Sequence, residues 1–305
     1  MLFTGNTQES PACCPFSKRF CERYRMPSLT DGNKMKQLGL VILLAMLAGC
    51  TSRKDGQNSH GAHQETADPH AGHHPNMAGG MLMVKTDPTE VKVGQPATLR
   101  LMIHDADGTL IKDFDVVHEK KVHLILVHDG LDRFAHIHPD QIDSAGNITA
   151  SFTFPTGGKY RLYADYKAVG KDSAVAQAEV EVAGISPPAA KLTPNVPGKV
   201  TGDGLNANVS IENDKESSVR ISFALLDQAD KPVTDLQPYL GAMGHLVVIS
   251  ADGRRYVHAH PVEDNAAGGK VRFETDFPGP GIYKGWGQFQ RAGKVYVVPF
   301  VIQRQ

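Results

Sequence analysis

Cysteine is scarce in this sequence, and the larger part of the chain has none. All four cysteines lie at or before Cys50. Residues 51–305 therefore cannot form a disulfide, a zinc–thiolate site or a thiol nucleophile. A blue-copper electron-transfer centre is excluded as well, because it needs a cysteine thiolate.

The chain also lacks a charge imbalance and any recognisable catalytic motif. Its formal net charge is −1 at pH 7, so no basic field argues for nucleic acid as a partner. No phosphate-binding loop, nucleophile elbow or carboxylate pair stands out. His-x-His after a strand also opens barrel-type metal hydrolases, but those need parallel βα units that this sequence does not offer. We therefore expect that the protein is not an enzyme.

A short apolar run near the N-terminus is typical of an export signal. Residues 35–50 read MKQLGLVILLAMLAGC, with a lysine, an apolar stretch too short to span a bilayer, and small residues before Cys50. LAGC resembles the lipobox of bacterial lipoproteins, which implies that Cys50 carries a lipid and begins the mature chain. A plain signal or an interfacial helix is the alternative. A start codon assigned too early, with Met35 as the true start, would then explain residues 1–34. The alternative is that they form a long segment preceding the signal.

A polar segment rich in histidine follows Cys50. Residues 51–83 hold few large apolar side chains and many Gly, Ser, Pro and Ala, which is typical of a flexible tether. Imidazoles suit Cu(II), Zn or Ni, and thioethers add affinity for Cu(I), so the composition predicts metal contact, although a solvated linker would have the same composition. The candidate ligands are His60, His63, His70, His73, His74 and Met77, with Met81 and Met83 close behind.

The rest of the chain matches itself. HLILVHDGLDRFAHIHP starts at His123 and HLVVISADGRRYVHAHP starts at His245, a shift of 122 residues. Flanking stretches match as well, with one residue inserted on the downstream side. This period is far longer than that of a solenoid, so we expect a tandem duplication of whole domains. The domains are predicted at 84–185 and 200–305, joined by a Pro-rich linker at 186–199.

Each copy has the pattern of β structure. Short runs rich in β-branched and aromatic residues alternate with turn dipeptides, and no helical period extends over a dozen residues. Roughly seven strands in about a hundred residues predict an all-β fold, a two-sheet sandwich of immunoglobulin-like or cupredoxin-like type. Tyr160 and Tyr283 start a late strand in each copy, which resembles a tyrosine corner. We expect both phenols to hydrogen-bond to the backbone.

Residues 87–114, DPTEVKVGQPATLRLMIHDADGTLIKDF, resemble the YtkA-like family of bacterial extracytoplasmic proteins. The matching features are the VGQ lead, a strand and an Asp-Gly turn, and they cover under half of one copy. The resemblance implies a secreted β-sandwich, often found near copper-handling proteins. It supplies no ligand residues, so the His-x-His-Pro elements are interpreted from their own chemistry.

The His-x-His-Pro element of the first copy predicts a cluster of imidazoles. His136 and His138 are two residues apart and share a face of their strand. A two-residue turn at Asp129-Gly130 would place His123 opposite His136 and Lys121 opposite His138, with opposed Cβ atoms ~5 Å apart. The three imidazoles could then share Cu(II) or Zn. They could equally be structural, with His123 buried against a backbone carbonyl and the pair bracing the hairpin.

The second copy repeats this pattern and adds a thioether. The matching register places His245 opposite His258 and Met243 opposite His260, and a turn at Asp252-Gly253 would slide the register by two without changing faces. Sulfur is the softer ligand, whereas a lysine in the first copy would oppose a cation, so the second copy is predicted to bind Cu(I) more tightly. Binding should weaken below ~pH 6.5, where free imidazole takes up a proton.

Three further histidines, His104, His118 and His128, have no histidine counterpart in the second copy, and we expect them on the surface or in loops. The sequence thus predicts a lipid-anchored protein of the cell envelope that binds copper, or alternatively zinc, and sequesters or transfers it without catalysis. Its expected partners are the membrane, through Cys50, and an envelope metal-handling protein. The alternative function is a non-metal interaction module that docks another envelope protein.

Overall fold

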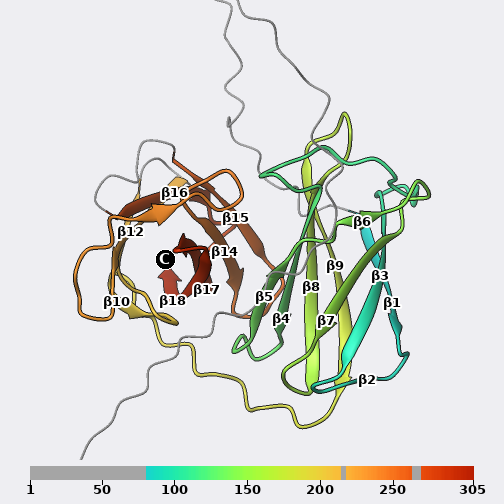
Figure 1. Ribbon diagram of the computed structural model, residues 1–305, viewed down its shortest axis with the longest axis horizontal. Coiled ribbons are helices and arrows are strands. Elements are labelled where there is room, and N and C mark those ends of the chain that lie inside the picture. The colour runs from blue at the N-terminus through green and yellow to red at the C-terminus, as the bar shows by residue number, and fades with distance from the viewer. Residues whose placement is uncertain (1–79, 214–217, 263–268) are drawn as a thin grey trace, which may run out of the picture. The chain divides into compact units, whose positions relative to one another are not determined.

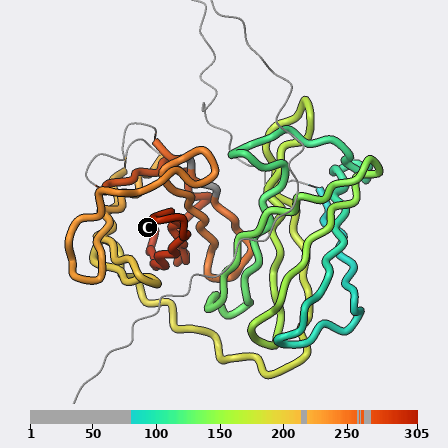
Figure 2. The backbone as a smooth tube through the Cα atoms, viewed as in Figure 1, coloured from blue at the N-terminus to red at the C-terminus, as the bar shows by residue number. Residues whose placement is uncertain are grey.

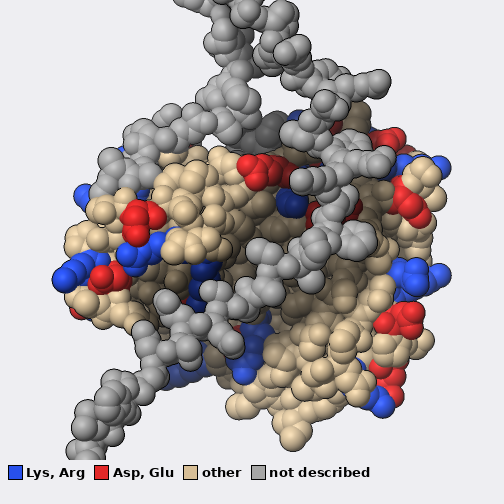
Figure 3. All heavy atoms as spheres, viewed as in Figure 1, with Lys and Arg blue, Asp and Glu red and all other residues tan. Residues whose placement is uncertain are grey.

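The computed structural model describes residues 80–213, 218–262 and 269–305, except for the side chains of His258 and His260. These ranges form eighteen β-strands and no α-helix, which confirms the predicted all-β fold (Figure 1). They likewise contain no helix with the length and hydropathy needed to span a bilayer. Acidic and basic side chains are interspersed on the face seen in Figure 3, as expected from the net charge of −1.

The first copy is a nine-stranded unit made from one continuous stretch of chain. Its strands are β1 (Met81–Asp87), β2 (Val91–Lys92), β3 (Pro96–His104), β4 (Val122–His128), β5 (Phe134–Ile137), β6 (Gln141–Ile142), β7 (Ile148–Thr153), β8 (Gly158–Lys167) and β9 (Ser173–Ala183). Hydrogen bonds connect them in the order β5-β4-β8-β9-β1-β3-β7-β6, with β2 on β9. β1 thus begins before the predicted domain boundary at residue 84.

The second copy also has nine strands, and it occupies the yellow-to-red part of the tube in Figure 2. They are β10 (Gly198–Thr201), β11 (Asn206–Asn213), β12 (Ser218–Leu226), β13 (Leu236–Gln237), β14 (His245–Ser250), β15 (Tyr256–Pro261), β16 (Lys270–Asp276), β17 (Gly281–Arg291) and β18 (Lys294–Arg304). The order is β10-β11-β12-β16-β15-β14-β17-β13, with β18 on β17. The two copies share the antiparallel pairs β4–β8 and β14–β17, which position the histidines.

Strict alternation of side chains along β3 shows how each sandwich forms its core. Leu99, Leu101 and Ile103 are fully buried, whereas Arg100 and Met102 between them face the other way. An apolar residue at every second position gives a strand one dry face, and two such faces packed together exclude water. The second copy has the same arrangement around a cluster of phenylalanines. They are Phe223, Phe273, Phe289 and Phe300.

β4 differs from β3 because both of its faces are buried. Leu124 and Leu126 belong to the core of the first copy, whereas Ile125 and Val127 belong to a separate apolar cluster. The second cluster is formed jointly by the two copies. Besides Ile125 and Val127 it contains Leu131, Tyr163, Val175, Val247, Ile249, Tyr256 and Trp286. A strand buried on both faces has a continuous apolar sequence, which accounts for the run VHLILV.

Two aromatic pairs link the copies within this joint cluster. Phe134 stacks on Trp286 with ring centroids 4.8 Å apart and an interplanar angle of 11°, and Tyr163 lies 5.5 Å from Tyr256. Phe134 corresponds to Tyr256 in the duplication, and Tyr163 corresponds to Trp286. The same contact is therefore made twice with the roles of the copies exchanged, as in an isologous interface. Each such pair contributes ~0.5–1.5 kcal/mol beyond the buried area.

The tyrosine corner is present in the second copy and altered in the first. The Tyr283 hydroxyl donates to the carbonyl of Gly279 at 2.8 Å, as predicted. The Tyr160 hydroxyl instead lies 2.7 Å from the Thr156 hydroxyl. Both rings are almost fully buried, so each phenol still finds a polar partner at the edge of its sandwich.

Candidate metal centre

His123 is held at the start of β4 with its side chain 5% exposed. Its Nε2 lies 2.9 Å from the carbonyl oxygen of Val117, which closes a tight turn with Lys120. A carbonyl can only accept, so Nε2 carries the proton, and Nδ1 of the neutral ring keeps its lone pair. The hydrogen bond to a backbone carbonyl that is expected of a structural histidine is therefore present. The same bond is what fixes the tautomer and orientation of many metal-ligating histidines.

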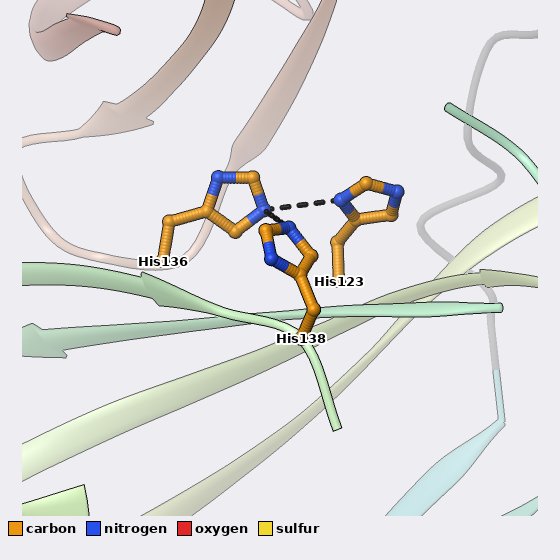
Figure 4. A group of neighbouring side chains, drawn as sticks. All are labelled: His123, His136 and His138. Carbon is orange, nitrogen blue, oxygen red and sulfur yellow. Dashed lines mark hydrogen bonds between the residues drawn. The ribbon is translucent and has the colours of Figure 1, made fainter. Parts of the chain in front are cut away.

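Three imidazole nitrogens converge next to this turn (Figure 4). Nδ1 of His123 lies 3.1 Å from Nε2 of His136, and Nε2 of His138 lies 3.0 Å from the same atom. Within the described residues, His123, His136 and His138 form a group of metal-ligating side chains that lie close enough to hold one metal ion. We call this group the histidine trio. A tetrahedral ion with bonds of ~2.0–2.1 Å separates two ligand nitrogens by about 3.3 Å. The two distances from Nε2 of His136 are thus already close to the spacing that a bound ion requires.

The hairpin register that brings the trio together differs from the predicted one. His136 pairs with Ile125, and not with His123, so the register is shifted by two residues. Continuing this register brings His138 to the level of His123. The loop is longer than the predicted two-residue turn because the backbone N–H of His128 donates to the carbonyl of Arg133. A shift of two keeps every side chain on its face, so the predicted cluster survives.

Side-chain contacts of His128 hold this longer loop. Its Nδ1 lies 2.5 Å from a carboxylate oxygen of Asp132, and its Nε2 lies 3.2 Å from the Ser186 hydroxyl. The ring is 2% exposed, so the expectation of a surface or loop position for His128 was wrong. The expected clash of Lys121 with a bound cation is also removed, because Lys121 is exposed and precedes β4.

Burial keeps His136 and His138 neutral. It lowers the pKa of His136 well below the usual value, and the neighbouring histidines, His138 first, lower it further. It also lowers the pKa of His138 to about 4, with His123 contributing in the same direction. Neutral imidazole is the form that binds a metal. The site therefore presents ligands that are ready at neutral pH, without competing protons.

Hydrogen bonds between neutral rings cannot satisfy both close contacts of Nε2 of His136. His123 presents a lone pair through Nδ1, so Nε2 of His136 must carry a hydrogen to bond with it. In that state Nε2 of His136 cannot accept a hydrogen bond from His138. Neutral rings can therefore form one linear hydrogen bond among the two close contacts. A cation between the rings would engage a lone pair from each of them.

Residues that were not predicted at this site surround it: Gln288 and His245 from the second copy and His118 from the first. The side-chain amide of Gln288 places Nε2 at 3.1 Å and Oε1 at 3.3 Å from Nδ1 of His136, so rotation of the amide can serve either tautomer. The His245 ring stacks 6.2 Å from that of His123. The ring of His118 contacts that of His245 edge-on at 5.1 Å. His118 occupies the tight turn with φ 48°, so it is a loop residue as predicted, but one that faces the site.

The predicted site of the second copy is described in part. Nε2 of His245 lies 3.4 Å from the carbonyl oxygen of Leu240. His258 and His260 lie in β15, where His258 pairs with Val247, but their side chains are outside the described part. This register corresponds to the alternative turn at Asp252-Gly253. Met243 is half-buried against the core of the second copy.

The remaining predicted site residues precede the described ranges. They are the lipidation candidate Cys50 and the tether ligands His60, His63, His70, His73, His74 and Met77.

Comparison with solved structures gives distant matches. FdeC, an adhesin of Escherichia coli, is 15% identical with a TM-score of 0.24, over 74% of this chain and 64% of that one. Invasin, a bacterial integrin-binding protein, is 13% identical with a TM-score of 0.22, over 72% of this chain and 39% of that one. The chain thus spans less than two thirds of either protein. At these TM-scores neither match supports an argument about function.

A family match covers most of the chain. The sequence has no match among curated proteins. The family described as a domain of unknown function (DUF8832) matches residues 77–184 and again residues 199–305. The two matches coincide with the two nine-stranded copies and confirm the internal repeat. The chain therefore belongs to the DUF8832 family and carries two copies of its domain.

Proposed function

We propose that this protein binds a transition-metal ion at the histidine trio and sequesters or transfers it without catalysis. The supporting observation is that Nε2 of His136 lies 3.1 Å from Nδ1 of His123 and 3.0 Å from Nε2 of His138, two contacts that neutral rings cannot both satisfy with linear hydrogen bonds. Imidazole suits both copper and zinc, and the general affinity order places Cu(II) above Zn. Copper is therefore the proposed metal and zinc the alternative.

The proposed location is the outer side of a bacterial cell membrane. The lipobox-like LAGC sequence supports lipid anchoring through Cys50, and the similarity of residues 87–114 to YtkA-like proteins supports an extracytoplasmic position. The histidines of the tether would then lie on the same side of the membrane as the sandwich domains. An envelope metal-handling protein is the proposed partner for transfer.

Metal titration of the full-length protein tests this function. Binding of Cu(II) and Zn is measured by native mass spectrometry and by competition with a chromophoric chelator. The double variant His136→Gln/His138→Gln should bind one ion fewer than the parent, because glutamine keeps a polar side chain but removes the imidazole lone pair.

A matched control separates this site from the tether. The variant His70→Gln/His73→Gln also removes two imidazoles, and it should leave the ion of the trio in place. Unchanged stoichiometry and affinity in His136→Gln/His138→Gln would overturn the proposal. The non-metal interaction module would then be the favoured function.

A further inference from the structure

A second group of metal-binding side chains lies on the outer face of the β1–β3 pair. In that antiparallel ladder Met81 pairs with His104, and Met83 pairs with Met102. Paired residues and residues two apart share one face, so the four side chains form a contiguous block. The residues between them, Leu82 and Ile103, point into the core of the first copy. We call this block the thioether patch.

The imidazole of the thioether patch has an unsatisfied nitrogen. His104 is half-buried, and its Nδ1 is inaccessible to solvent yet has no hydrogen-bond partner in the described structure. Most buried polar side-chain atoms in proteins have a partner, and an orphan of this kind needs an explanation. A bound ion would supply the missing partner.

The second copy shows that the fold does not need these residues. β12 corresponds to β3 at the same 122-residue shift, so Ala224 and Leu226 stand where the first copy has Met102 and His104. In the β11–β12 ladder their partners are Asn208 and Asn206. The duplicated sandwich thus forms with no thioether and no imidazole at these four positions. Their presence in the first copy calls for a role other than folding.

The exposure of the methionines also argues against a packing role. Met81 is 57% exposed and Met83 is 38% exposed. Outer strand positions favour β-branched and aromatic residues, and methionine offers no comparable advantage there. Three thioethers on adjacent positions supply soft, neutral, polarisable sulfur.

We propose that Met81, Met83, Met102 and His104 form a Cu(I) site on the outer face of the β1–β3 pair, separate from the histidine trio. Opposed Cβ atoms in such a ladder lie ~4.5–5.5 Å apart, which lets flexible methionine side chains turn their sulfur atoms toward one ion. The next pair along the ladder is Lys85 with Arg100. Two cations one step away disfavour hard divalent ions, whereas a singly charged soft ion is held by its affinity for sulfur.

Methionine-methyl NMR of the full-length protein tests this site. The probe is Cu(I) buffered with bicinchoninate, and a Met77→Leu background removes the thioether of the tether. The ε-methyl signals of Met81, Met83 and Met102 should shift together as Cu(I) is added, separately from that of Met243, and Zn should leave them in place. The triple variant Met81→Leu/Met83→Leu/Met102→Leu should bind one Cu(I) fewer.

Two further variants distinguish Cu(I) binding at the thioether patch from metal binding at the histidine trio. His104→Gln should weaken Cu(I) binding at the patch, because one of its four ligands is lost. His136→Gln/His138→Gln should leave the methionine shifts unchanged, so loss of the trio and loss of the patch are read separately. The proposal is overturned if the methionine signals do not move with Cu(I), or if the triple variant binds as much Cu(I) as its parent.

Discussion

Gln288 and His136 are 152 residues apart in the sequence, and Nε2 of the glutamine lies 3.1 Å from Nδ1 of the histidine. Gln288 is 2% exposed and comes from β17 of the second copy. It pairs with His245 across the sheet, just as Asp165 pairs with His123 in the first copy. The candidate metal centre of one copy is therefore completed by the other.

Replacing Gln288 by leucine should weaken metal binding at the histidine trio about tenfold or more. Loss of a partner that orients a ligand histidine typically costs ~10–100-fold in metal affinity. Competition titration with Cu(II) and Zn measures the change. Gln303→Leu, at an exposed position of β18, is the matched control and should bind like the parent. Equal affinities in both variants would show that Gln288 does not orient His136.

The metal-free protein should lose stability as the pH falls from ~6.5 to ~4. In the unfolded chain His136 and His138 titrate near the ordinary value of ~6.5. Burial lowers the folded-state pKa of His138 to about 4 and that of His136 well below its usual value. Over this range the unfolded state takes up protons that the folded state refuses, so the free energy of unfolding decreases.

Urea unfolding at several pH values between 4 and 8 measures this loss. Acidic groups also titrate in the range, so the comparison is with His136→Gln/His138→Gln, whose stability should fall less steeply. Parallel curves for the two proteins would contradict the lowered pKa values. The same lowering implies that the trio keeps its metal below the ~pH 6.5 expected from free imidazole.

The second copy is still predicted to be the tighter Cu(I) site. Met243→Leu should weaken Cu(I) binding more than Cu(II) binding, because sulfur is the softer ligand. His258→Ala/His260→Ala should remove the site while circular dichroism shows the sandwich intact. If the metal-free double variant instead unfolds, these histidines brace the hairpin and are not ligands.

Replacement of Cys50 by alanine should prevent lipid attachment. The variant should accumulate as an unlipidated precursor, detected by intact mass, and should be retained or released abnormally on cell fractionation. A normal mature mass together with normal membrane retention would exclude Cys50 as the anchor.

Local patterns in the sequence were sufficient for the fold and for the faces of the strands. Alternation fixes which residues share a face, so His136 and His138 could be placed together with His123. The register could not be fixed in the same way, because the hairpin loop is held by contacts of His128 with Asp132 and Ser186. The last of these residues lies 58 positions away in the chain.

Gln288 and His118 could not be recognised from the sequence as neighbours of the histidine trio. Glutamine is not a residue type expected as a metal ligand, so Gln288 did not stand out. His118 has no histidine counterpart in the duplication. Met102 and His104 lie on a strand whose partner, β1, begins in the segment predicted to be a tether. The thioether patch becomes visible once the β1–β3 register is known.

The joint cluster between the copies affects which residues can differ at equivalent positions of the two halves. Two identical chains meeting in this way would be obliged to carry the same residue at both equivalent positions. A single chain that contains both halves escapes that constraint. It places a carboxylate at Asp165, bonded by the hydroxyl of Tyr256, where the other half has the amide of Gln288. Covalent fusion thus allows one inherited architecture to hold different polar groups at its two equivalent positions, always in a one-to-one ratio.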